Sequence, residues 1–316
     1  MQPLIVLAGP TAVGKTALSI RLAQEIGGEI VSADSMQVYR HMDIGTAKVT
    51  PEEQQGIPHY LIDCCEPDEE FHVVEYQRAA REALQTIYSH GAIPIVTGGT
   101  GFYIQALVRD IDFTETGGDP AYRRGLEERA AADGGEALYT ELTRLDPEAA
   151  ASMHPHNIKR VIRALEYYHF TGEKISEHNR RERERRSPYN TLYLVINRER
   201  AELYRRIDRR VDLMLEQGLV EEVERLRQKG YSRHLVSMQG LGYKEIREAL
   251  EGEIPMEEAI YKLKRDTRHF AKRQLTWFRR EPEAVWLNRE DYAGEEEMLA
   301  QILLLCREHG ILTQGT

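Results

Sequence analysis

The chain has 316 residues, of which 41% are hydrophobic and 30% charged, with a formal net charge of −10. This composition is typical of a soluble globular protein with room for two domains, and no apolar run approaches the roughly 18 residues that a membrane-spanning helix needs. The three cysteines, Cys64, Cys65 and Cys306, lack C-x-x-C spacing, which argues against disulfides and structural zinc. We therefore expect a cytoplasmic protein, and nothing in the sequence implies a membrane or a protein partner.

A phosphate-binding loop follows the first strand, which is expected at residues 3–8. The loop sequence Gly9-Pro10-Thr11-Ala12-Val13-Gly14-Lys15-Thr16 matches G-x-x-x-x-G-K-[ST], and a helical pattern begins at once at residues 17–25. Glycines let backbone N–H groups face an anion, and the positive end of the new helix adds to their field. Lys15 supplies a point charge, and the Thr16 hydroxyl can ligate Mg²⁺. The motif predicts a polyphosphate site without saying whose phosphates it holds.

The second strand is expected at residues 29–33 and ends at Asp34. At this place beside a phosphate-binding loop, a carboxylate can act as a general base for an attacking nucleophile. Because Ser35 follows, the same aspartate can instead cap a local turn. Position alone leaves both roles open.

A magnesium-binding aspartate of the kind that nucleoside triphosphatases use is not evident at a later strand end. The strand expected at residues 93–97 runs into the turn Gly98-Gly99-Thr100-Gly101, and Asp63 is the last residue of only a weak strand pattern at residues 59–63. The sequence therefore disfavours ATP hydrolysis. It favours a reaction in which diphosphate leaves, which needs the same cradle and no hydrolytic water.

Strands and helices alternate over the first hundred residues, with a long helix expected at residues 73–89. This order predicts an α/β fold, namely a P-loop NTPase-like parallel sheet with helices on both faces. Ligands of such sheets lie at the carboxyl ends of the strands. The phosphate-binding loop, Asp34 and the turn at residues 98–101 are therefore expected to converge on one crevice.

The pattern becomes helical after residue 112, and strand character returns only at residues 191–196. We therefore expect a catalytic core formed by residues 1–112 and 190–316, with mostly helices in its second part, and a helical insertion domain at residues 113–189. The insertion contains an apolar stripe at helical spacing, formed by Ile158, Val161, Ile162, Leu165 and Tyr168. Three basic residues lie off this stripe: Lys159, Arg160 and Arg163.

Basic residues are clustered although the chain is acidic, within residues 180–186, 198–210 and 262–280. Such clusters can form a local surface for a phosphate backbone, or salt-bridged helix faces, because acidic residues are interleaved with them. Arg206 and Arg210 are four residues apart and share one helix face, which suits a polyphosphate or RNA. From the residues alone, a salt-bridged surface helix is the favoured interpretation of this pair.

Further motifs, together with the phosphate-binding loop, resemble those of the bacterial tRNA dimethylallyltransferases, also called tRNA isopentenylpyrophosphate transferases. They occur in the family's order over nearly the whole chain, and the zinc finger of some eukaryotic relatives is absent. The motifs lie at residues 32–39 (SADSMQVY), 42–48 (MDIGTAK), 58–59 (PH), 98–103 (GGTGFY), 160–166 (RVIRALE), 241–243 (LGY) and 271–277 (AKRQLTW).

The resemblance implies transfer of a dimethylallyl group from dimethylallyl diphosphate to N6 of the adenine next to the anticodon. The substrates would be tRNAs that read codons beginning with U, and diphosphate would be released. Residues 9–16 would bind the diphosphate, with Mg²⁺ at Thr16, and Asp34 would accept the proton from N6. Either Arg206 or Arg210 would help to neutralise the diphosphate, and the sequence does not decide which.

The resemblance also implies which residues contact tRNA, partly from the insertion domain. The region of the target adenine would be contacted by Asp34, Ser35, Met36 and Gln37, and the rest of the tRNA by Thr100, Arg123, Lys159, Arg160, Val161, Ile162 and Arg163. Three alternatives remain: a small-molecule kinase that uses the P-loop for ATP, a prenyltransferase that acts on free adenosine phosphates, and a non-catalytic RNA-binding protein.

Overall fold

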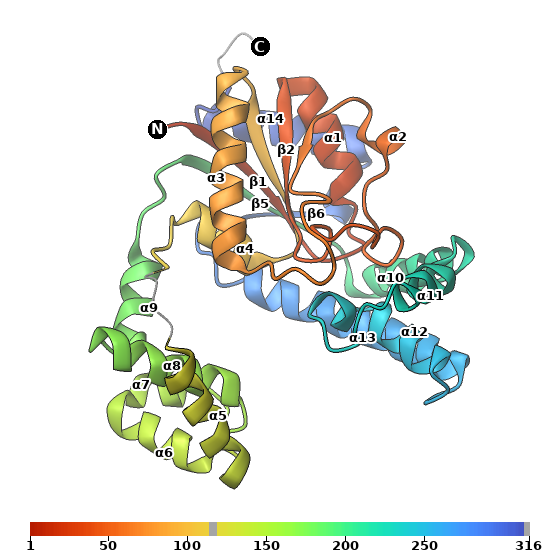
Figure 1. The fold of residues 1–316 in the computed structure, drawn as a ribbon. Coiled ribbons are helices and arrows are strands. Elements are labelled where there is room, and N and C mark those ends of the chain that lie inside the picture. Colours follow the sequence, from red (N-terminus) through yellow and green to blue (C-terminus); the bar gives the residue numbers. More distant parts are fainter. Residues whose placement is uncertain (114–118, 313–316) are drawn as a thin grey trace. The chain divides into compact units, whose positions relative to one another are not determined.

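The computed structural model describes residues 1–113 and 119–312 (Figure 1). The chain divides into two compact units, one formed by Met1–Val108 with Ser187–Thr316 and the other by Arg109–Arg186. The second unit begins and ends a few residues before the boundaries expected for the insertion domain. No helix among the described residues is both long enough and apolar enough to cross a membrane.

The first unit is built on a six-stranded sheet in which all strands are parallel, in the order β3-β2-β4-β1-β5-β6. The strands are β1 (Pro3–Ala8), β2 (Gly28–Ala33), β3 (His59–Tyr60), β4 (Ile93–Gly98), β5 (Asn190–Asn197) and β6 (Val285–Asn288). The expected α/β class is therefore confirmed. Because β1 lies in the middle, between β4 and β5, the phosphate-binding loop leaves the centre of the sheet.

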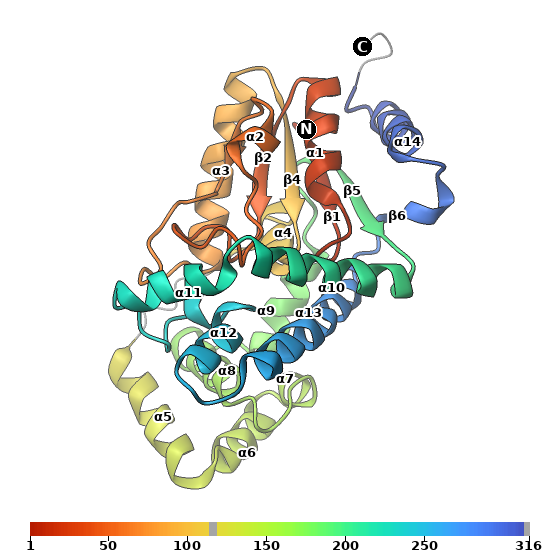
Figure 2. The ribbon, with the colours of Figure 1, turned by 90° about the vertical axis from the view of Figure 1, so that its right-hand side faces the viewer.

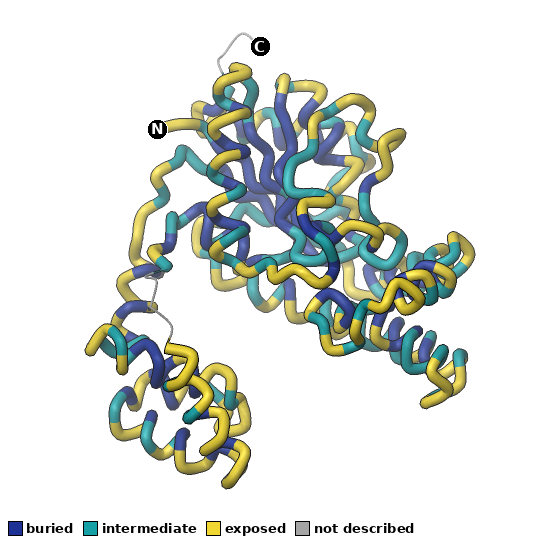
Figure 3. The backbone as a smooth tube through the Cα atoms, viewed as in Figure 1, coloured by how far each residue is buried: buried dark blue, intermediate teal, exposed yellow. Residues whose placement is uncertain are grey.

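Alternate residues of each strand face opposite sides of the sheet, so each side has its own apolar core. Ile5 and Leu7 of β1 pack with α1 (Lys15–Ile26) and α14 (Glu295–Glu308). Val6, on the other side, packs with α3 (Val73–Ser89) and α4 (Gly101–Val108). Figure 3 shows these strands as the most continuously buried part of the chain. Helices on both faces are thus confirmed, including the C-terminal helix as a cover of the core.

Two strands differ from the expectation. The strand β3 is only two residues long, because Leu61 and Asp63 take positive φ angles of 63° and 54°, which end extended structure. The edge strand β6 was not predicted from the sequence. Its four residues pair in parallel with β5, and such a short segment takes strand form only through this long-range pairing.

Four helices after β5 form a layer below the carboxyl ends of the strands (Figure 2). They are α10 (Arg200–Glu216), α11 (Leu219–Gln228), α12 (Tyr243–Leu250) and α13 (Met256–Phe278), as the amphipathic pattern predicted. Their apolar faces share a cluster with Val38, Tyr39 and Met42 from the segment after β2. The remaining short helices of this unit are α2 (Pro51–Gln54), η1 (Ser237–Gln239) and η2 (Arg289–Asp291).

Helices are the only regular secondary structure among the described residues of the second unit. Its helices are α5 (Pro120–Asp133), α6 (Glu136–Leu145), α7 (Pro147–Ala151), α8 (Ile158–Thr171) and α9 (Ile175–Glu184). The predicted stripe of α8 forms the core of this unit, with Val161, Ile162 and Leu165 at most 2% exposed. Ile158 and Tyr168 are half-buried, and the three basic residues off the stripe are exposed.

Candidate active site

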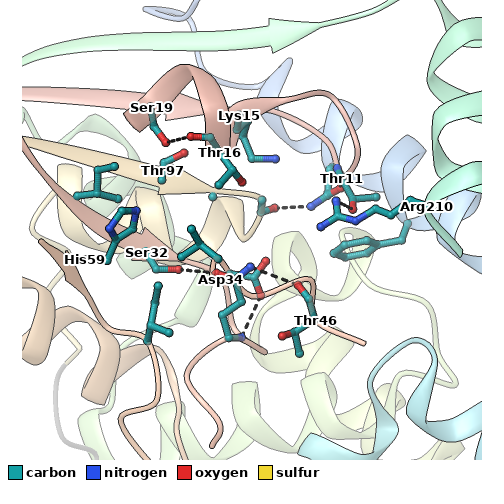
Figure 4. Close-up of a pocket in the computed structure, with 18 residues that line it drawn as sticks. Thr11, Lys15, Thr16, Ser19, Ser32, Asp34, Thr46, His59, Thr97 and Arg210 are labelled. Carbon is teal, nitrogen blue, oxygen red and sulfur yellow. Dashed lines mark hydrogen bonds between the residues drawn. The ribbon is translucent and has the colours of Figure 1, made fainter. Parts of the chain in front are cut away.

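A cavity lies at the carboxyl ends of β1, β2 and β4 (Figure 4). The three segments expected to converge do so, because Lys15, Asp34 and Gly99 all line this cavity. A second cavity, more apolar in its lining, adjoins the first and shares Thr11, Asp34 and Arg210 with it. The crevice predicted from strand order is therefore present, and the phosphate-binding loop contributes Thr11, Lys15 and Thr16 to its lining.

Close packing with the sheet explains the first glycine of the phosphate-binding loop. Gly9 has a φ of 154°, and a Cβ there would lie 2.6 Å from the carbonyl oxygen of Ile196 in β5. The loop closes through Lys15, whose ammonium donates to the carbonyls of Gly9 at 3.0 Å and Pro10 at 2.9 Å. Burial and then the charge of Arg210 lower the pKa of Lys15 to about 7, against the opposing effect of Asp34. An arriving anion would reverse this shift.

Both arginines of α10 reach the phosphate-binding loop. Arg206 donates from Nε to the carbonyl of Ala12 at 2.9 Å, and Arg210 donates to the Thr11 hydroxyl at 3.3 Å. The interpretation of this pair as part of a salt-bridged surface helix is therefore wrong. Arg210 is half-buried and lines the cavity that contains Lys15 and Asp34. Arg206 is exposed and lines a neighbouring cavity, which Lys15, Thr16 and Arg210 also line. Burial lowers the pKa of Arg210, and the negative charge of Asp34 opposes this.

Asp34 forms the local turn and also lines the two cavities. Its Oδ1 accepts the backbone N–H of Met36 at 2.9 Å and that of Gln37 at 3.4 Å, which is the local turn. Among the described residues no hydrogen bond to Oδ2 is found, and the carboxyl group lines both cavities. One oxygen thus orients the carboxylate, and the other is available to a substrate.

The residues expected near the target adenine form a connected network beside Asp34. The Thr100 hydroxyl accepts the backbone N–H of Ser35 at 3.0 Å and lies 3.3 Å from the Ser35 hydroxyl. Gln37 donates from Nε2 to the carbonyls of Thr46 and Ala47, both at 3.2 Å. The Met36 side chain packs against Gly240, where a Cβ would lie 2.4 Å from its methyl carbon.

Gln274 of α13 joins the two glycine-rich segments of the site, and it was not singled out from the sequence. Its Oε1 accepts the N–H of Thr11 at 2.9 Å, and its Nε2 donates to the carbonyl of Gly99 at 3.0 Å. A Cβ on Gly99 would lie 2.1 Å from this Nε2, so the glycine makes room for the amide. The residue lies in a motif that supported the family resemblance, but a lone glutamine carries no signal for partners so distant in sequence.

The expected tRNA-binding residues of the insertion fall into three groups. The side chains of Val161 and Ile162 are buried in the core of this unit, so these side chains are not available to an RNA surface. Lys159, Arg160 and Arg163 are exposed on the same helix. The remaining one, Arg123, forms ion pairs with Glu127 at 3.1 Å and Glu166 at 3.0 Å.

Asp63 and Thr16 differ in whether they could offer an oxygen ligand to a cation in the cavity. Asp63 does not line the cavity, since its Oδ1 accepts from the ammonium of Lys48 at 2.6 Å. Within the described part of the chain, no group of three or more His, Cys, Asp or Glu could hold a metal. The hydroxyl of Thr16 and the carboxylate of Asp34 line one cavity, and this sparse oxygen set fits Mg²⁺, which binds with few protein ligands beside phosphate oxygens and water.

Known proteins resemble this chain over nearly its full length. A family model described as IPP transferase matches residues 37–281. A tRNA dimethylallyltransferase of Lachnoclostridium phytofermentans is 58% identical over 312 residues, which cover 99% of this chain and 100% of that protein. Another, of Alkaliphilus oremlandii, is 50% identical over 300 residues, which cover 95% of this chain and 96% of that protein.

Solved structures agree with these matches. The full-length tRNA isopentenylpyrophosphate transferase of Bacillus halodurans has 42% sequence identity and a TM-score of 0.74, with 98% of each chain covered. A eukaryotic dimethylallyltransferase acting on tRNA has 31% identity and a TM-score of 0.86, with 100% of this chain and 82% of that chain covered. Because the family model spans more than half of the sequence and the relatives align along almost all of it, the chain belongs to the IPP transferase family.

Proposed function

We propose that the protein transfers a dimethylallyl group from dimethylallyl diphosphate to N6 of the adenine next to the anticodon of tRNA, releasing diphosphate. The observation that carries this proposal is the shared cavity, in which an anion cradle with Lys15 and Arg210 faces the carboxylate of Asp34. An anionic leaving group and a proton on the acceptor are the two things that such a reaction must handle. The relatives named tRNA dimethylallyltransferase support the same reading.

The cradle would act mainly on the departing diphosphate. An exocyclic adenine amine is a poor nucleophile because its lone pair is delocalised into the ring, so the allylic C–O bond must ionise readily. Lys15, Arg210 and the backbone N–H groups of the phosphate-binding loop would stabilise the charge that develops on the leaving oxygen. Asp34 would accept the N6 proton as the new C–N bond places positive charge on that nitrogen.

Mg²⁺ is proposed as the cofactor, with the Thr16 hydroxyl as its protein ligand. When bound, the cation would neutralise part of the charge on the diphosphate. Lys15 and Arg210 would hold the phosphate oxygens from the other sides of the cavity. Oxygen ligands from the substrate and from water would complete the coordination, which is common for this cation.

The tRNA is proposed to bind through two regions of the chain. The target adenine would leave the stack of the anticodon loop and enter the cavity beside Asp34, as base-modifying enzymes require. Lys159, Arg160 and Arg163 of the insertion would contact the phosphate backbone. A cytoplasmic location belongs to the same proposal, since the three cysteines are free thiols and an anticodon must be accessible.

One assay separates this proposal from its alternatives. The protein is incubated with radiolabelled dimethylallyl diphosphate and Mg²⁺ in the presence of unmodified tRNA, AMP or no acceptor. We expect label in tRNA alone. Label in AMP would identify an adenylate prenyltransferase, and substrate-stimulated consumption of ATP in a parallel reaction would identify a kinase. Binding of tRNA with no transfer under any condition would indicate a non-catalytic RNA-binding protein.

A further inference from the structure

Glu222 is a buried carboxylate that lines neither of the two cavities beside Asp34. It belongs to α11, and its residue is 2% exposed. Its Oε2 accepts the backbone N–H groups of Asp43 at 3.0 Å and Ile44 at 2.9 Å. Its Oε1 accepts the N–H of Gly45 at 3.1 Å and the hydroxyl of Tyr243 at 2.7 Å. Burying a carboxylate is costly unless all of its acceptor positions are used, and here four donors converge on it.

The conformation of the turn at residues 43–45 depends on the hydrogen bonds that it makes to this carboxylate. Three successive N–H groups of residues 43–45 point at one side chain, which is the arrangement by which backbone amides bind an anion. The Tyr243 ring closes the turn from the other side, because a Cβ on Gly45 would lie 2.6 Å from it. Burial and then the charge of Glu222 raise the pKa of Tyr243 well above its usual value, so its hydroxyl remains a donor.

The same turn leads directly to the residues beside Asp34. The carbonyls of Thr46 and Ala47, which follow it, accept both hydrogen bonds from the side-chain amide of Gln37. The backbone N–H of Gln37 is in turn bonded to Oδ1 of Asp34. Hydrogen bonds, together with the short stretches of covalent chain between them, therefore connect the carboxylate of Glu222 to that of Asp34.

We propose that Glu222 is a positioning residue, whose carboxylate sets the turn at residues 43–45 and, through Gln37, the position of the Asp34 carboxylate in the cavity. The inference rests on the proposed dimethylallyl transfer. It adds that the helical layer of α11 and α12 defines the geometry of the acceptor side of the site. The diphosphate side is held separately, by the phosphate-binding loop, α10 and Gln274.

The test compares Glu222→Gln with the wild-type protein. The amide keeps the volume but replaces one acceptor oxygen by a donor that faces N–H groups. We expect kcat for transfer to tRNA to fall roughly 10- to 100-fold, the size of effect that a misplacement of about 1 Å produces. The dissociation constant of diphosphate should change less than about twofold, since none of the four bonds touches the phosphate-binding loop.

Glu29→Gln is the matched control. Glu29 is also a buried carboxylate, and its Oε2 accepts from the hydroxyl of Tyr60 at 2.6 Å. It lies near the start of β2, at the opposite end of the strand from Asp34. We expect kcat of the Glu29→Gln variant, calculated per folded molecule, to match that of the wild-type protein. A loss in both variants alike would assign Glu222 to general stability and overturn the inference.

Two further measurements separate positioning from stability. If Glu222 acts through Gln37, the effect on kcat of Gln37→Met should not add to that of Glu222→Gln, whereas independent effects would multiply. Tyr243→Phe removes one of the four bonds and serves if Glu222→Gln does not fold. We expect a smaller loss of kcat for it, again without change in diphosphate binding, and full wild-type kcat would contradict the inference.

Amide hydrogen exchange decides the matter independently of activity. In Glu222→Gln, exchange in the peptide covering residues 34–48 should accelerate while that of residues 9–16 stays unchanged. Unaltered exchange in residues 34–48 would overturn the inference even in an active enzyme. A wild-type protein that transfers no dimethylallyl group would instead refute the proposed function, and the exchange result would still stand.

Discussion

Lys15 occupies a pocket that disfavours its charge until an anion arrives. Its pKa is lowered from 10.5 to about 7, first by burial and then by Arg210, while Asp34 acts in the opposite direction. The unfolded chain therefore binds more protons at this residue between pH 7 and 10.5, so the contribution of Lys15 to stability of the ligand-free protein rises with pH through that window. In the proposed function, phosphate binding by Lys15 would thus come at some expense of stability.

This shift predicts proton uptake when diphosphate binds. At pH 8 most Lys15 side chains in the ligand-free protein are neutral, and the phosphate charge should raise the pKa and draw a proton onto the amine. At pH 6 the amine already carries it. Calorimetry in buffers of different ionisation enthalpy would measure the uptake, with Lys15→Arg as the control that stays charged throughout. Equal uptake in both proteins at pH 8 would contradict the prediction.

The hydrogen bonds of Asp34 show which substitution would test its role as a base. Asp34→Asn keeps an Oδ1 acceptor for Met36 and Gln37 and so preserves the turn, but it removes the base. We expect transfer to fall by about 10²–10⁴-fold, which is typical for loss of a general base, while tRNA binding stays nearly unchanged. Single-turnover transfer and a filter-binding titration would measure the two quantities. Wild-type turnover in this variant would remove Asp34 from the mechanism.

At the scale of elements, α10 carries the two arginines that face the phosphate-binding loop. A helix of 17 residues holds both on one side because they are four residues apart. Only Arg210 lines the cavity that also contains Lys15 and Asp34. Both arginines line a neighbouring cavity together with Lys15, so they differ in that Arg210 also reaches the cavity of Asp34.

Replacing each arginine by alanine should weaken diphosphate binding to a different extent. Arg210→Ala should weaken diphosphate binding by roughly 10- to 100-fold, as expected for loss of a charged hydrogen bond worth about 1.5–3 kcal/mol. Arg206→Ala should have a smaller effect, since it is exposed to solvent. Arg205→Ala is the control, because this residue of the same helix pairs with Glu202. Equilibrium titration with diphosphate checks the order, and a larger loss for Arg206 would reverse the assignment.

For the molecule as a whole, the net charge and the local charge on α8 lead to opposite expectations about RNA binding. The chain has a net charge of −10, yet it carries exposed basic residues on the polar side of α8. A phosphate backbone responds to the local field more than to the net charge. An acidic protein can therefore bind tRNA with a steep dependence on salt.

The insertion supplies a prediction for this surface. Changing Arg160 and Arg163 together to Ala should weaken tRNA binding and reduce the slope of log K against log salt by about 0.7–0.9 for each lost contact. Diphosphate binding should be unaffected. The control is Arg129→Ala with Arg144→Ala, which removes two exposed arginines from other helices of the same unit. Unchanged affinity and slope in the first pair would move the RNA surface elsewhere, with residues 180–186 as the next candidates.

Features that depend on neighbours in the chain could be predicted from the order of the amino acids. The phosphate-binding loop, the strand ending at Asp34, the helix Val73–Ser89 and the buried stripe of α8 all follow from local periodicity and from glycine, lysine and hydroxyl spacing. Parallel strand order then predicted that the loop and Asp34 would share one cavity. Local signals are sufficient there because the chemistry and the backbone geometry are encoded within a few residues of each other.

The distant groups that complete the site could not be predicted in this way, because they meet only in the folded chain. The Thr11–Gln274 bond joins residues 263 positions apart, and the bonds of Glu222 to residues 43–45 join residues separated by nearly 180. The inward direction of Arg210 and the strand β6 depend in the same way on contacts with remote segments. Side-chain spacing shows which residues share a face of a helix. It does not show what that face meets, because that is settled by the packing of whole elements against one another.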